Sequence, residues 1–151
     1  MLNVRFHQEV TVDAKGRVAL PSALRRALED RGLCKLVVTF TQGRLRAWDL
    51  QTFMTDVEQP IAALDPFDPN VNDFADGMLA FATDVDVDGQ GRILLPKKLR
   101  ELAGIESVVI ANSMLRYVDL WEPTRWEKRA AEAIARVAEQ RGMPAKREDV
   151  R

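Results

Sequence analysis

Two short segments each place an arginine four residues after an aspartate, a spacing that suits an anion-binding turn. Asp13 is followed by Arg17, and Asp88 is followed by Arg92. A glycine precedes each arginine and can adopt a positive φ, while each aspartate can accept backbone N–H groups across the turn. A guanidinium held in such a turn can bind a phosphate or the edge of a guanine. These residue types at this spacing therefore predict contacts to nucleic acid.

The tips of the two turns differ in charge. Lys15 lies at the tip of the first turn, whereas the second turn has Gln90 at the matching position. A lysine that projects from a turn beside an arginine is expected to contact phosphate. Because Gln90 carries no charge, the two turns are not expected to contribute equally. The residues predicted to contact DNA are Lys15, Arg17, Arg5, Arg92 and Gln90.

A structural role for the two arginines is the alternative interpretation. Arg17 and Arg92 would then pair with Asp13 and Asp88 and hold each turn closed, as surface salt bridges commonly do. Both interpretations can hold together if the aspartate orients the arginine. Arg25 and Arg100 recur at one position of a predicted helix in each copy. We expect them to cover the end of a barrel or to pair with a carboxylate, and a contact with DNA is the less favoured alternative.

The two turns belong to an internal repeat. Residues 10–28 and 85–103 align without gaps, and nine of these nineteen positions are identical. Alternating apolar residues predict a strand on each side of the turn, and a proline then opens a short helix. Two further strands follow in each copy. The residues assigned to the structure of the turns and helix starts are Asp13, Gly16, Asp88, Gly91, Pro21 and Pro96.

One unit of this size cannot bury both its strands and its helix alone, so the two units are expected to complete each other. We predict a mostly β structure with flanking helices (α+β), in which two β-α-β-β repeats form one barrel with a pseudo-two-fold axis. The predicted segments are repeat 1 at 7–54, an acidic helical connector at 55–81, repeat 2 at 82–125, and a C-terminal helix and charged tail at 126–151.

The remaining segments are predicted to be helical. In the connector, one helix begins near Phe53 and is kinked or shortened by Pro60, and another covers about 72–82 after a break at Pro69. Near the C-terminus, Thr124 and Glu127 have the spacing of a capping box and predict a helix start.

The charge is unevenly distributed along the chain. The net charge is −1, but residues 51–90 contain nine acidic residues and no Lys or Arg, so each flanking segment is basic. Affinity for phosphate depends on local patches rather than on the total charge. The net charge therefore does not exclude a nucleic-acid partner.

Signatures of other protein classes are missing from the sequence. It contains no phosphate-binding glycine loop, no His-containing zinc set, and no Ser or Cys nucleophile with a histidine partner. We therefore expect no enzyme, no cofactor, no metal and no small-molecule substrate. No apolar run approaches the roughly 20 residues that span a bilayer, and Cys34 is the single cysteine. These features predict a cytoplasmic protein with no membrane partner.

The arginine-bearing turn, followed by Leu-Pro and a short helix, resembles the SpoVT-AbrB swapped-hairpin family over essentially residues 4–141. The resemblance implies a double-psi-type barrel and ring-shaped homo-oligomers. It also implies a nucleoid-associated transcriptional regulator that binds double-stranded DNA at short direct repeats, upstream of a division and cell-wall gene cluster that includes its own operon. In the family the turn with the arginine binds DNA, which corresponds here to residues 13–17 and 88–92.

Two other functions stay open from the sequence. An antitoxin-like module would bind a partner protein as well as DNA, although the duplication within one chain counts against it. A ring-forming scaffold would contact another protein through the acidic connector.

Overall fold

The computed structural model describes residues 2–140 and 142–146, and it contains the same order of elements twice. The first copy comprises β1 (His7–Thr11), β2 (Arg17–Ala19), α1 (Ser22–Asp30), β3 (Lys35–Thr41) and β4 (Arg44–Trp48). The second comprises β5 (Thr83–Asp86), β6 (Arg92–Leu94), α5 (Lys97–Ala103), β7 (Val108–Ser113) and β8 (Val118–Trp121). The strands pair antiparallel, so the predicted α+β class is confirmed.

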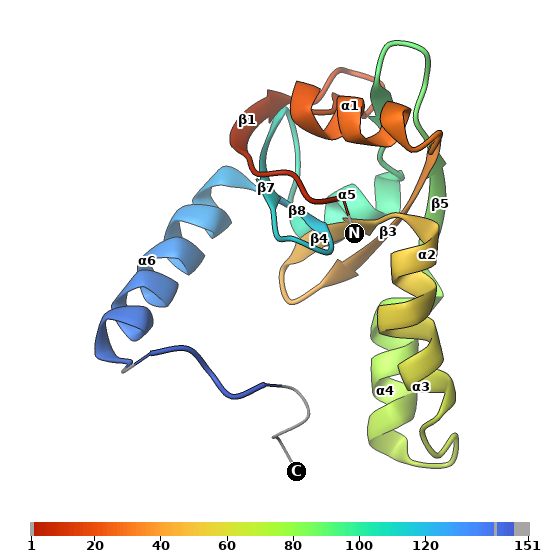
Figure 1. Cartoon of the computed structure of the whole chain (residues 1–151), viewed down its shortest axis with the longest axis vertical. Coiled ribbons are helices and arrows are strands. Elements are labelled where there is room, and N and C mark those ends of the chain that lie inside the picture. Colours follow the sequence, from red (N-terminus) through yellow and green to blue (C-terminus); the bar gives the residue numbers. More distant parts are fainter. Residues whose placement is uncertain (1, 141, 147–151) are drawn as a thin grey trace.

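The two units exchange strands. β1 pairs with β7 of the second unit, and β5 pairs with β3 of the first. β4 and β8 pair at the centre of the resulting six-stranded sheet, whose order over the described residues is β1-β7-β8-β4-β3-β5 (Figure 1). β2 and β6 form a separate ladder in which Val18 faces Ile93. The first strand of each unit thus pairs with a strand of the other unit.

The core lies between these sheets and the two short helices. Side chains that alternate along the strands, such as Val18 and Val109, are fully buried because successive residues of a strand point to opposite faces. Leu24 on α1 and Leu99 on α5 are also buried, at equivalent positions of the repeat. The apolar faces predicted for strands and helices are therefore confirmed.

A helical hairpin separates the two units in the chain. α2 (Leu50–Phe53), the π-helical segment η1 (Met54–Glu58) and α3 (Gln59–Ala62) form one arm, and α4 (Pro69–Met78) with the 3-10 turn η2 (Leu79–Phe81) forms the other. The arms run side by side away from the sheet (Figure 1). The wide turn of η1 ends at Glu58, two residues before Pro60, which lacks the N–H that a regular helix would use.

The start of α4 differs from the prediction. A break was predicted at Pro69, with the helix beginning near residue 72, but Pro69 is itself the first residue of the helix. Proline is tolerated there because the first helical position needs no N–H. The side chain of Asp68 caps the helix by accepting the N–H of Asn70 at 2.9 Å.

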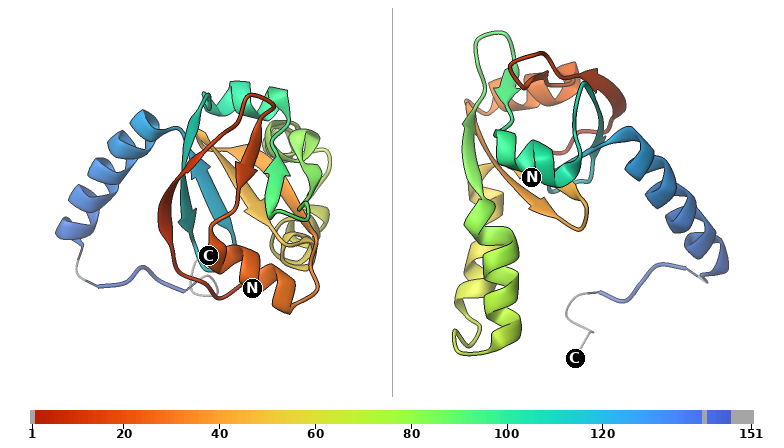
Figure 2. Two further views of the ribbon diagram at one scale, coloured as in Figure 1. Left: turned by 90° about the horizontal axis from the view of Figure 1, so that it is seen from above. Right: turned by 180° about the vertical axis from the view of Figure 1, so that it is seen from behind.

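The last helix, α6 (Pro123–Glu139), extends away from the sheet, and none of its residues is buried (Figure 2). The predicted capping box at Thr124 is wrong. Glu122 is the cap, and its side chain accepts the N–H groups of Thr124 and Arg125, both at 2.9 Å. Because Pro123 occupies the first helical position, the helix begins earlier in the chain than predicted. Of the predicted tail, residues 141 and 147–151 lie outside the described residues. No helix in the described ranges is long and apolar enough to span a bilayer.

Candidate nucleic-acid interface

The first turn connects β1 to β2 and is held by one carboxylate. Asp13 Oδ1 accepts the N–H groups of Lys15 and Arg17 at 3.0 and 2.8 Å, and its Oδ2 accepts Nε of Arg17 at 2.7 Å. The backbone N–H of Gly16 donates to the carbonyl of Asp13 at 2.9 Å. Gly16 has φ +88°, which an L side chain rarely adopts. The aspartate thus closes the turn and fixes the direction of the guanidinium.

The second turn, between β5 and β6, repeats this geometry. Asp88 Oδ1 accepts the N–H groups of Gln90 and Arg92 at 2.8 and 2.9 Å, and Oδ2 accepts Nε of Arg92 at 2.9 Å. Gly91 has φ +73°. The ion pairs predicted between aspartate and arginine are present in both turns. Lys15 and Gln90 are exposed at the tips, as expected for side chains at the tip of a turn.

These hydrogen bonds lower the pKa of each carboxyl group and use only the Nε atom of each arginine side chain. The backbone N–H of Arg17, followed by its side chain, lowers the pKa of Asp13, and the backbone N–H of Arg92 lowers the pKa of Asp88 in the same way. Both aspartates are therefore ionised at neutral pH. Arg17 and Arg92 bind them through Nε, and the side chains stay 33% and 29% exposed. Within the described ranges, the terminal nitrogens of these two arginines have no hydrogen-bond partner.

An arginine from the opposite unit packs against each turn glycine, and this part of the site was not predicted. A Cβ placed on Gly16 would lie 2.7 Å from Cζ of Arg100, and one on Gly91 would lie 2.5 Å from Cδ of Arg25. The helix of one unit therefore supports the turn of the other. The recurrence of these arginines in both copies indicated that they have a role, but the sequence did not show that they contact the turn glycines. Those contacts follow only from the exchange of strands between the units.

The ladder between β2 and β6 holds the two turns at its opposite ends. The N–H of Leu95 donates to the carbonyl of Gly16 at 3.0 Å, and that of Leu20 donates to the carbonyl of Gly91 at 2.9 Å. Because four residues separate Gly16 from Leu20, the two turns lie about 13 Å apart along the ladder. Figure 1 shows both turns at the end of the molecule opposite the tip of the helical hairpin.

The structure does not bring Arg5 to these turns. Arg5 is exposed and precedes β1, whereas the first turn follows β1. The five residues of β1 alone span about 13 Å. Pro21 and Pro96 directly precede α1 and α5, so they shape the helix starts and are not part of the charged cluster.

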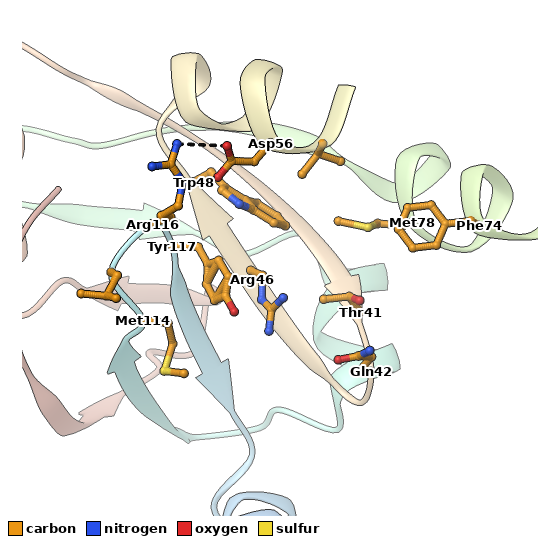
Figure 3. A pocket seen from close by; sticks show the side chains of 12 residues that line it. Thr41, Gln42, Arg46, Trp48, Asp56, Phe74, Met78, Met114, Arg116 and Tyr117 are labelled. Atoms are coloured by element: carbon orange, nitrogen blue, oxygen red, sulfur yellow. Dashed lines mark hydrogen bonds and ion pairs between the residues drawn. The ribbon is translucent and has the colours of Figure 1, made fainter. Parts of the chain in front are cut away.

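A groove of about 430 Å³ lies elsewhere, between the helical hairpin and the sheet. Figure 3 shows Arg116 paired there with Asp56, and the hydrogen bond from Arg116 Nη2 to Asp56 Oδ1 is 3.0 Å long. Arg46 in the same groove binds the buried Asp119, at 2.8 Å from Nε. Both cations in this groove are therefore engaged by carboxylates. No group of three His, Cys, Asp or Glu side chains that could hold a metal ion occurs within residues 2–140 and 142–146.

Comparison with known proteins agrees with the repeated units. The family described as "MraZ protein, putative antitoxin-like" matches residues 5–72 and 78–143. A protein of Thiobacillus denitrificans named transcriptional regulator MraZ is 31% identical over 83% of this chain and 85% of its own. Proteins with the same name from Gluconacetobacter diazotrophicus and Thermomicrobium roseum are 35% and 37% identical, over 89% and 79% of this chain and 87% and 81% of theirs. Since the family match covers both units and these relatives align over most of their length, the chain belongs to the MraZ family.

Proposed function

We propose that this chain is a sequence-specific DNA-binding transcriptional regulator. The observation that carries the proposal is the pair of turns, in which an aspartate fixes an arginine by Nε and its terminal nitrogens have no partner among the described residues. The names of the relatives, transcriptional regulator MraZ, support the same function.

The geometry of the turn suits contacts to double-stranded DNA. With Nε on Asp13, the two terminal nitrogens of Arg17 can donate to a phosphate or to O6 and N7 of a guanine. Lys15 at the tip adds a charge that binds phosphate without sequence preference. Arg92 and Gln90 occupy the same positions in the second turn. Arg5 lies apart from both turns and would contact DNA only from a separate surface.

One turn offers few contacts, so several subunits must act together. We propose a ring-shaped homo-oligomer that presents many copies of the turn to successive direct repeats, since linked sites gain from effective concentration. The proposed target is the DNA upstream of the division and cell-wall gene cluster, including the chain's own operon, in the cytoplasmic nucleoid.

The double-psi-type barrel is part of this proposal. The isolated bridge between Val12 and Val18 connects the end of β1 to β2, and β2 pairs with β6. The N–H of Val12 also donates to the carbonyl of Ser107 at 2.8 Å, which extends the contact with the second unit. These bonds support a closed barrel that combines the two sheets and holds both turns on one rigid frame.

The proposal is tested by fluorescence anisotropy with labelled duplex DNA from upstream of the chain's own gene, at several salt concentrations. Arg17→Ala should abolish specific binding and leave the melting temperature nearly unchanged, because the exposed ion pair of Arg17 with Asp13 contributes about 1 kcal/mol or less. Arg129→Ala removes an exposed cation from α6 and is the matched control. If Arg17→Ala binds this DNA like the parent protein, the proposed function of the turn is wrong.

A further inference from the structure

The arginines that support the two turns differ in their counter-charge. Arg25 on α1 donates from Nε to Glu29 at 3.1 Å and from Nη2 to the carbonyl of Gly89 at 3.2 Å. At the position equivalent to Glu29, α5 is followed by Gly104. The guanidinium beside the second turn is therefore neutralised within its own helix, and the one beside the first turn is not.

Arg100 keeps its terminal nitrogens free. Its Nε donates to the carbonyl of Leu95 at 3.1 Å, which holds the guanidinium against Gly16. No carboxylate pairs with Arg100, and no partner is found for its terminal nitrogens, in the described part of the chain. A guanidinium anchored by Nε in this way is preorganised to donate to an anion.

The two turns consequently carry different local charge. Residues 13–17 together with the arginine packed on Gly16 comprise three cations, Lys15, Arg17 and Arg100, and one carboxylate, Asp13. Around the second turn lie Arg92 and Arg25, balanced by the carboxylates Asp88 and Glu29. The first turn is thus positive by two charges, whereas the second is neutral. Local charge of this kind determines affinity for phosphate.

We propose that the first turn is the phosphate-binding turn of the protein, and that Arg100 from the opposite unit binds the DNA backbone there together with Lys15 and Arg17. This inference rests on the proposed DNA-binding function. The second turn retains its geometry but binds phosphate weakly, because Glu29 competes for Arg25.

The equivalent positions of the repeat provide a matched pair of variants, Arg100→Gln and Arg25→Gln. Each removes one guanidinium from beneath one turn glycine. Arg100→Gln should weaken binding to duplex DNA about tenfold or more, and the slope of log K against log salt should become less negative by about 0.9 for each engaged turn. Arg25→Gln should change the affinity less than twofold. Melting curves show whether each variant is folded.

Glu29→Gln tests the same idea without altering either arginine. It releases Arg25 and should tighten DNA binding severalfold with a steeper salt dependence. Equal losses of affinity in Arg100→Gln and Arg25→Gln would show that both arginines only support the turns, which overturns the inference, as does unchanged binding by Glu29→Gln. If Arg17→Ala loses binding but Arg100→Gln does not, the inference fails while the proposed function stands. If Arg17→Ala also binds normally, the proposed function itself fails.

Discussion

Replacement of Gly16 by alanine tests the contact between the two units at the first turn. Gly16 has φ +88°, and a Cβ there would lie 2.7–2.9 Å from the guanidinium of Arg100. The substitution therefore carries a backbone cost of about 1–2 kcal/mol. It must also displace the guanidinium of Arg100, which is the far end of a flexible side chain, so the main further cost is the lost hydrogen bond to Leu95, about 1 kcal/mol. We expect Gly16→Ala to destabilise the protein by about 2–3 kcal/mol.

Gly32→Ala is the matched control, because Gly32 has φ +64° and a Cβ added there would meet nothing within 4 Å. Its cost should be the backbone cost alone, about 1–2 kcal/mol, or a fall of a few degrees in melting temperature for a chain of this size. Urea denaturation at a fixed protein concentration, followed by tryptophan fluorescence, gives the free energy of unfolding of both variants.

The double variant Gly16→Ala/Arg100→Ala separates the clash from the backbone cost. Once Arg100 is removed the new methyl group has space, so the double variant should be about 1 kcal/mol more stable than additivity of the single variants predicts. Additivity within about 0.3 kcal/mol would refute the reasoning, because it would mean that Gly16 and Arg100 do not meet in the folded protein.

Three further substitutions, two of them paired with a control variant, have defined outcomes. Asp119→Ala should cost about 3–5 kcal/mol in urea denaturation, because it leaves two largely buried arginines unpaired, whereas Asp56→Ala breaks a more exposed pair and should cost about 1 kcal/mol or less. Glu122→Ala should lower the helix content measured by circular dichroism and cost about 1 kcal/mol, whereas Glu127→Ala should leave both unchanged. Because the pKa of Asp13 is below its ordinary value of 3.8, its stabilisation is complete above about pH 5 and is lost as the pH falls through the lowered value. The stability difference between Asp13→Asn and the parent should therefore be constant above about pH 5 and shrink in more acidic urea titrations.

The sequence contained enough information to predict the turns, because their geometry is local. Asp13, Gly16 and Arg17 lie within five residues, and their hydrogen-bonding capacity and backbone freedom lead to one compact arrangement. The predicted pairing of aspartate and arginine is present. The alternation of apolar residues also identified the buried faces of the strands.

The partners of those strands were beyond what the pattern could specify. The apolar face of β1 has the same period whether β1 pairs within its own unit or with the other unit, so Val10 opposite Val109 could not be deduced. The contact of Arg100 with Gly16 depends on that exchange and was missed for the same reason. The position of Arg5 also depends on the direction of β1, which carries it away from the turn.

The residues at which two of the helices begin were also not determined by the sequence pattern. Near Pro123, Glu122 and Thr124 are both able to accept backbone N–H groups, and the capping-box spacing favoured Thr124. Proline at the first helical position decided the outcome, as it did at Pro69, because its missing N–H costs nothing there.

The exchange of β1 and β5 ties the evolution of the two halves together. A chain with one unit alone would need a second identical copy to supply a partner for its first strand, and every substitution would then appear twice about the two-fold axis. The helical hairpin joins two units in one chain, so Glu29 can be present in one half while Gly104 takes its place in the other. Covalent linkage thereby permits a structure built from two equivalent units to acquire two chemically different turns. Selection can then maintain one turn for its ligand while the other turn diverges.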